Sequence, residues 1–397
     1  MYRLIFALLF QPFFSIVYCQ NSASEPQESS YKNLLLQEIS FGLDQKFRFL
    51  DSTILILDVR TGILDKAITE AKDVSSEANK LRERLQYIEQ KQSAIEDAET
   101  AIYLANYQSA IINLVSMERE IKPLTLFQST RDFGSALASA ANPMEYPGYR
   151  QWYSKFYEYV EKQKAKEPIL GVLSHMVTLT GDITKTFTFS GPVTEPLFSG
   201  INSFIQSLGG SKKELREESQ KMFLITASLA QWNHEKEVIE KEWLTITTEL
   251  ELLQKQYEHV LAANMNMIGL NQSAFNQKFC KENDAHKRFS YLSDLKETCA
   301  DFVVSEKTKS PKQWKEKIYF QMMDIQTLKV RFGSITSQMR ANIERYHTII
   351  IRYKTDPYIG SRIATLEPKL REMTDTFDRS FEPADYLASA TRMYRVQ

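Results

Sequence analysis

Two long stretches of this chain, residues 63–122 and 211–268, contain neither glycine nor proline. These two residues disfavour helix interiors most strongly, so their absence over such lengths favours uninterrupted helices. Apolar residues recur there every three or four positions, a spacing typical of an α-helix with one buried face. In the first stretch they are Leu64, Ala67, Ala71, Val74, Ala78, Leu81, Leu85, Ile88, Ile95 and Ile102. In the second they are Ile225, Leu229, Trp232, Ile239, Trp243, Ile246, Leu250, Leu253, Tyr257 and Val260, with Lys236 as the polar exception.

A third periodic stretch follows Pro311 and runs to Tyr353, with Gln321 and Asn342 at seam positions. Seams that repeat every seven residues over several heptads indicate helices that lie side by side at a shallow angle. We therefore predict an all-α fold, an elongated bundle whose longest helices reach roughly 80 to 90 Å. Shorter helices are expected over residues 31–59 and in the C-terminal region.

The composition supports a folded chain: of 397 residues, 13 are Gly and 12 are Pro, and 43% are hydrophobic. These proportions argue against a disordered chain and against a polytopic membrane protein. The 49 Lys and Arg residues nearly balance the 50 Asp and Glu residues. No overall field would therefore attract nucleic acid, and we predict no nucleic-acid partner.

Residues 1–19 have the features of a secretory signal peptide. Arg3 precedes apolar runs on either side of Pro12, and small residues, Val17 and Cys19, stand at the positions that signal peptidase reads before a cut ahead of Gln20. We predict a secreted or periplasmic protein, and a lipid anchor at Cys19 is the minor alternative. The remaining chain divides into N-terminal helices over 20–145, a head insertion over 146–210 and C-terminal helices over 211–397.

Cys280 and Cys299 remain after removal of the signal peptide, an even number in an oxidising compartment. A disulfide between them is the default expectation, and two buried free thiols are the alternative. One straight helix would separate the two α-carbons by about 28 Å, whereas a disulfide needs less than about 7 Å. The disulfide therefore requires the chain to fold back between the two residues.

The head insertion differs in composition from the helices around it. Residues 168–210 hold six of the 13 glycines and three charged residues, and residues 184–190 alternate polar and aromatic side chains as a short strand of a β-hairpin would. The aromatic residues upstream follow helical spacing, which predicts either one buried helix face or an amphipathic surface for a partner or membrane. The candidate contact residues are Tyr149, Trp152, Tyr153, Phe156, Leu173, Met176, Phe187, Phe189, Leu197, Phe198 and Phe204.

Patterns that carry catalysis or bind metals are nearly absent from the sequence. The five histidines are far apart, and Glu344 with His347 is the single Glu-x-x-His pair, where a di-iron bundle needs two. We predict no enzyme activity, no cofactor, no metal site and no small-molecule substrate. A basic run of Lys307, Lys309, Lys312, Lys315 and Lys317 is interpreted as a solvated loop and helix start, with attraction of anionic lipid as the alternative. Asn271 begins an N-glycosylation sequon.

The signal peptide, the heptad-patterned helices and the apolar, glycine-containing insert together resemble the helical pore-forming cytolysins. The resemblance implies an insert that is held against the bundle until it meets a membrane. The insert departs from this pattern, because Asp182, Lys185 and Glu195 would be costly in lipid. We favour a non-enzymatic envelope or extracellular protein that contacts a protein partner, or a like subunit, through the head and the helices. Pore formation is the alternative.

Overall fold

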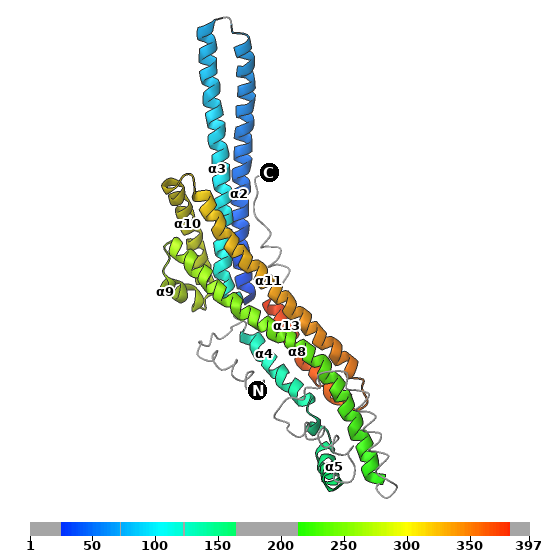
Figure 1. The fold of residues 1–397 in the computed structure, drawn as a ribbon. Coiled ribbons are helices and arrows are strands. Elements are labelled where there is room, and N and C mark those ends of the chain that lie inside the picture. The colour runs from blue at the N-terminus through cyan, green and yellow to red at the C-terminus, as the bar shows by residue number, and fades with distance from the viewer. Residues whose placement is uncertain (1–24, 72, 122–123, 164–212, 382–397) are drawn as a thin grey trace. The chain divides into compact units, whose positions relative to one another are not determined.

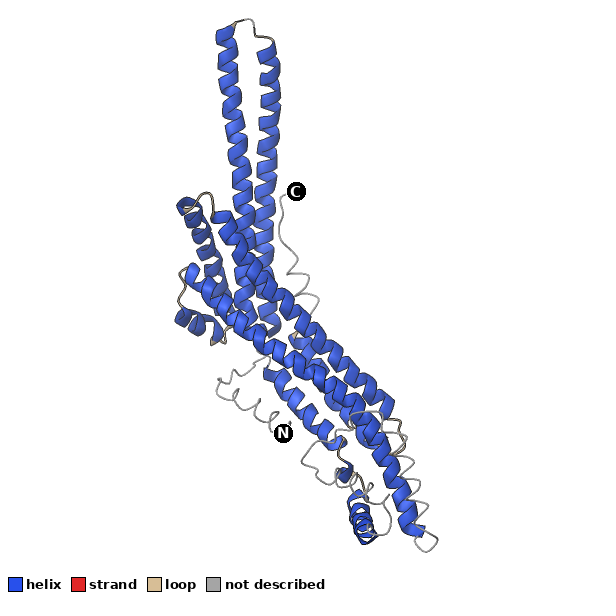
Figure 2. Cartoon of the chain, viewed as in Figure 1, coloured by secondary structure: helices blue, strands red, loops and turns tan. Residues whose placement is uncertain are grey.

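The computed structural model describes residues 25–71, 73–121, 124–163 and 213–381. Every regular element within these residues is a helix, and none of them forms a strand (Figure 2). The all-α prediction is confirmed. The β-hairpin predicted around residues 184–190 lies outside the described residues.

The chain divides into two compact units. The hairpin unit draws its described residues from the segments Cys19–Lys122 and Glu251–Ser334, and the aromatic unit from Pro123–Leu250 and Ile335–Glu382. Two long helices, α8 (Lys213–Met267) and α11 (Trp314–Tyr353), contribute residues to both units. Each unit is described separately below.

The hairpin unit contains two antiparallel helices, α2 (Glu25–Thr69) and α3 (Val74–Glu120), which lie side by side (Figure 1). At 45 and 47 residues, each is about 70 Å long. The turn between them falls inside the stretch without Gly or Pro, so the expectation of one continuous helix there is wrong. Asp73 ends the continuity: its carboxylate accepts a 2.7 Å hydrogen bond from the Ser76 N–H and caps α3.

The seam of this hairpin is apolar on α2, and α3 makes polar contacts with α2 over residues 80–91. Leucines at every seventh position of α2 are buried, namely Leu43, Leu50, Leu57 and Leu64. From α3, Arg84 pairs with Asp65 at 2.8 Å, Lys91 pairs with Asp58, and Lys80 donates to the Ala67 carbonyl. These ion pairs show which face of α3 turns toward α2.

Further helices complete the hairpin unit: α9 (Gln272–Phe275), a π-helical turn η4 (Asn276–Cys280) and α10 (Ala285–Lys309). The Asn271 side chain caps α9 by accepting from the Ser273 N–H. Helix α10 packs against α2 and α3, with the Tyr107 and Phe302 rings 5.6 Å apart. Lys296 joins the helices by an ion pair with Glu38 at 2.7 Å.

Cys280 and Cys299 are not joined to each other, so the disulfide expected from the sequence is absent from the structure. The chain does fold back between them, but it turns immediately after Cys280. Helix α10 then runs straight from Ala285 and carries Cys299 about 21 Å along its axis. The short connection before Ala285 does not bring the Cys280 thiol back over that distance.

The aromatic unit contains α4 (Leu124–Ala140), η2 (Pro143–Glu145), α5 (Tyr149–Gln163), α12 (Gly360–Ile363) and α13 (Leu366–Ser380), with parts of α8 and α11. Helix α4 packs against α13, and the Phe133 ring meets the edge of Tyr346 at 5.1 Å. The seam residue Asn342 is buried and donates to the Ile239 carbonyl. That hydrogen bond satisfies the amide nitrogen of Asn342 within an apolar seam.

Candidate functional sites

The aromatic cluster of α5 is part of the core of the aromatic unit. Tyr149, Trp152 and Phe156 are at most 2% exposed, and Trp152 packs on Phe156 at 5.0 Å and on the edge of Phe223 at 5.4 Å. The indole N–H of Trp152 donates a 2.8 Å hydrogen bond to the Ser219 hydroxyl, which is itself buried. The amphipathic-surface interpretation is therefore wrong for these three residues, and the buried-face interpretation is correct.

The burial follows from the helical spacing itself. Positions 149, 152 and 156 share one face of α5, and that face meets α8, where Tyr149 also bonds to the Thr226 hydroxyl at 2.9 Å. Tyr153, on a different face, is half-buried and stacks on Tyr157, which is 38% exposed. The other candidate contacts, Leu173, Met176, Phe187, Phe189, Leu197, Phe198 and Phe204, lie outside the described residues.

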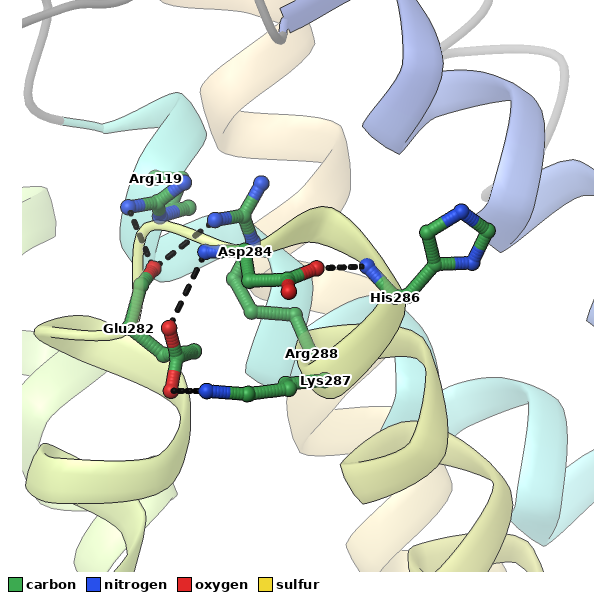
Figure 3. A network of polar contacts seen from close by, with 6 residues as sticks. All are labelled: Arg119, Glu282, Asp284, His286, Lys287 and Arg288. Carbon is green, nitrogen blue, oxygen red and sulfur yellow. Dashed lines mark hydrogen bonds and ion pairs between the residues drawn. The ribbon is translucent and has the colours of Figure 1, made fainter.

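A polar network surrounds the start of α10 (Figure 3). The Glu282 carbonyl accepts hydrogen bonds from the guanidinium groups of Arg288 at 2.7 Å and Arg119 at 3.4 Å. The Asp284 carboxylate accepts from the His286 N–H at 2.8 Å, and this bond lowers the pKa of Asp284. The network caps α10 and fastens the preceding turn to α3. Because its groups are engaged in these contacts, we assign it a structural role.

A second charged cluster in the hairpin unit consists of the half-buried Lys32 and Glu120 and the buried Lys329. Lys32 pairs with Glu120 at 2.8 Å, and Lys329 is only 4% exposed. The pKa of Lys329 is lowered to about 7, chiefly by burial and also by the nearby Lys32, while Glu120 opposes both effects. A neutral amine is nucleophilic, but a carbonyl substrate cannot reach one so deeply enclosed.

Lys329 was missed in the sequence because its charge argued for a solvated position. The spacing held the signal, since Lys329 lies four residues after Ile325 and three before Phe332, both of which are buried. A helix row that contains these apolar residues must bury Lys329 as well.

A groove of about 540 Å³ follows one face of α13 in the aromatic unit. Its described lining is Ala364, Glu367, Pro368, Arg371, Glu372, Asp375, Thr376 and Arg379. Charges of both signs alternate along this lining, and it contains no His or Cys. The arrangement is that of a solvated helix face and does not form a catalytic constellation.

Three lysines of the basic run around Pro311 form ion pairs or hydrogen bonds within the hairpin unit. Lys315 pairs with Glu99, Lys317 pairs with Glu306 at 2.7 Å, and Lys307 donates to the Thr100 hydroxyl at 3.0 Å. These contacts join α3, α10 and α11. Lys309, Lys312 and Lys317 are exposed, as the interpretation of a solvated helix start predicts, and three of the five lysines also form contacts with neighbouring helices.

Exposed apolar rows run along the α2–α3 hairpin. On α3, an apolar row of Val74, Leu81, Leu85, Ile88 and Ile95 is 44% to 82% exposed. On α2, Phe49, Ile56 and Ile63 are 52% to 71% exposed. The sequence pattern predicted that the α3 row would be buried in the helix seam, and that prediction is wrong for these five residues, whereas Ile102 of the same row is buried. The ion pairs of Arg84 and Lys91 with α2 turn a different face of α3 inward.

Comparisons with protein-family models, curated proteins and solved structures find no match for this chain. Among the described residues, no helix is both long and apolar enough to cross a membrane. No group of three or more His, Cys, Asp or Glu side chains in the described part of the chain is arranged to hold a metal ion.

Proposed function

We propose that this protein is an exported, non-enzymatic helical protein that binds a protein partner through the exposed apolar rows of the α2–α3 hairpin. The α3 apolar row (Val74, Leu81, Leu85, Ile88 and Ile95) carries the proposal. Four of its five members are spaced by seven residues, and all five are exposed. A row of this kind is suited to another helix, because heptad spacing places apolar side chains along one continuous seam.

The concentration of apolar surface on this hairpin supports the choice of contact site. Of the 22 large apolar side chains that are exposed among the described residues, 12 belong to α2 and α3. Single exposed apolar residues are normal, but contiguous rows mark interaction sites in soluble proteins. The proposal therefore moves the principal contact from the head insertion to the hairpin.

The polar clusters support the non-enzymatic part of the proposal. The network around Glu282 caps a helix, and the Lys329 amine is too enclosed to meet a substrate. The signal peptide proposed for residues 1–19 supplies the route of export. Pore formation by residues 169–208 remains the competing hypothesis.

Site-specific photocrosslinking tests the proposal. A benzophenone amino acid replaces Ile88 in the full chain, expressed in the cells that naturally make the protein, and a matched control carries the probe at exposed Gln90. We expect a covalent protein adduct at position 88 and none at position 90. Lipid adducts at position 88, or no adduct there, would overturn the proposal. Liposomes that leak dye with the intact chain, but not after deletion of residues 169–208, would favour the pore.

A further inference from the structure

We infer that the partner of the α3 apolar row is a second copy of this chain, with the two α3 helices antiparallel and Leu85 of one copy opposite Ile88 of the other. The inference rests on the proposed function and names its partner. It follows from three properties of α3: the spacing of the row, the charges on either side of it, and the area that the row exposes.

The apolar row is complementary to itself. Leu81 and Ile88 are seven residues apart, and Leu85 lies between them on the same face. When two such helices run antiparallel, Leu85 opposes Ile88 of the other copy, and the two-fold axis repeats this contact once more. A symmetric dimer needs only one surface that matches itself, and this row provides it.

The charges on the inner side of the row are already neutralised within each chain. Arg84 and Lys91 stand on the side that faces α2, and Asp65 and Asp58 pair with them. In the proposed register Arg84 lies near Lys91 of the other copy. Because each of these cations is already paired with a carboxylate of its own chain, the repulsion between Arg84 and Lys91 of the other copy is reduced.

The charges on the outer side have no such partners. Arg82 and Glu89 follow Leu81 and Ile88 in the sequence, both are exposed, and neither forms an ion pair within the described part of the chain. In an antiparallel pair these outer positions of the two helices face each other. Arg82 of one copy then lies about 3 Å along the axis from Glu89 of the other, a distance that long side chains span.

This complementarity selects the register. If the helices slid by one layer so that Leu81 opposed Leu85, Arg82 would face Arg82 of the other copy. The Leu85–Ile88 register instead forms two symmetric Arg82–Glu89 pairs. Like charges at such positions disfavour the slipped alternative.

The exposed area is suited to a dimer contact. From their exposed fractions, the five row side chains leave roughly 450 Å² accessible on each copy, more than half of the roughly 800 Å² that one partner contributes to a standard interface. The flanking polar side chains of α3 supply further area. The row therefore forms the apolar centre of an interface of ordinary size.

Sedimentation velocity of the purified full chain tests the inference through a charge exchange. We expect the wild type to dimerise, and Arg82→Glu or Glu89→Arg alone to raise the dimer Kd about tenfold, because each places two like-charge pairs in the interface. The double variant Arg82→Glu/Glu89→Arg should restore the wild-type Kd. Gln90→Arg, which adds a positive charge one position away from Glu89, should leave the Kd unchanged.

Several results would overturn the inference: a chain that is monomeric at every concentration, single variants that dimerise like the wild type, or a double variant no better than either single. Equal circular dichroism spectra for all variants exclude loss of folding as the cause. A monomeric chain whose position 88 still crosslinks to a different protein would overturn this inference and leave the proposed function standing.

Discussion

Replacing Trp152 by Phe tests whether the α5 aromatic cluster is core. Trp152 is 2% exposed, packs on Phe156 and Phe223, and donates its indole N–H to buried Ser219. The substitution removes part of the ring system and leaves the Ser219 hydroxyl without that donor. We expect a cost of about 3 kcal/mol, from about 1–2 for the lost packing and about 1–2 for the stranded hydroxyl.

A double-mutant cycle separates these two contributions. Ser219→Ala alone should cost about 2 kcal/mol, because it leaves the buried indole N–H without its acceptor. In the double variant Trp152→Phe/Ser219→Ala neither group remains unsatisfied. Its cost should therefore fall below the sum of the single costs by about 1–2 kcal/mol.

Urea unfolding followed by far-ultraviolet circular dichroism measures all three variants. The half-exposed neighbour Tyr157 provides the control, since Tyr157→Phe should change stability by less than about 0.5 kcal/mol. Strictly additive costs would refute the coupling between Trp152 and Ser219. A wild-type-like stability for Trp152→Phe would show that the cluster is exposed, and would return the head insertion to its role as the contact surface.

Three further predictions concern other parts of the chain. Ile246→Asp in α8 should lower the stability measured by thermal melting by several kcal/mol because Ile246 is buried. Leu244→Asp, at a position that is 45% exposed, should leave the stability nearly unchanged. Equal melting temperatures for the two variants would contradict the buried face assigned to α8. The pKa of Lys329 is about 7 in the folded chain and about 10.4 in the unfolded chain. Between these pH values the unfolded chain binds one more proton than the folded chain, so the stability of the wild type should rise from pH 7 to about pH 9. Lys329→Met should abolish this rise, and an unchanged slope would exclude Lys329 as its source. Alkylation of the native protein should modify Cys280 faster than Cys299, because Cys299 is fully buried and its pKa is raised to about 12. If neither cysteine reacted until a reductant was added, a disulfide between them would be indicated instead.

The periodic pattern predicted much of the helical structure. The seams of α8 and α11 hold as predicted at Trp232, Ile246 and Asn342, which are all buried. The spacing of apolar residues alone was sufficient to predict which side chains of α8 and α11 are buried, because their apolar rows face other helices of the chain. For α5 the same spacing left a buried face and a contact surface as alternatives, and the structure shows the buried face.

The pattern failed where charge and capping outweighed apolar spacing. On α3, Arg84 and Lys91 find carboxylates on α2, and the apolar row is left outside. A heptad row shows that a helix has an apolar face, but it does not say which neighbour covers that face. The α2–α3 turn was missed because it needs neither Gly nor Pro; the Asp73 cap, with Ser76 three residues later, was the signal available.

The contact role of the α3 apolar row is tested most directly by thiol labelling across a range of protein concentrations. Ile88→Cys and the control Gln90→Cys are labelled in separate full-length chains, and peptide mass spectrometry measures the rate at each position. We predict that position 88 reacts readily in dilute solution and becomes protected as the concentration rises, while position 90 reacts at a constant rate. A position 88 that is unreactive even when dilute, or equally reactive at all concentrations, would contradict the account.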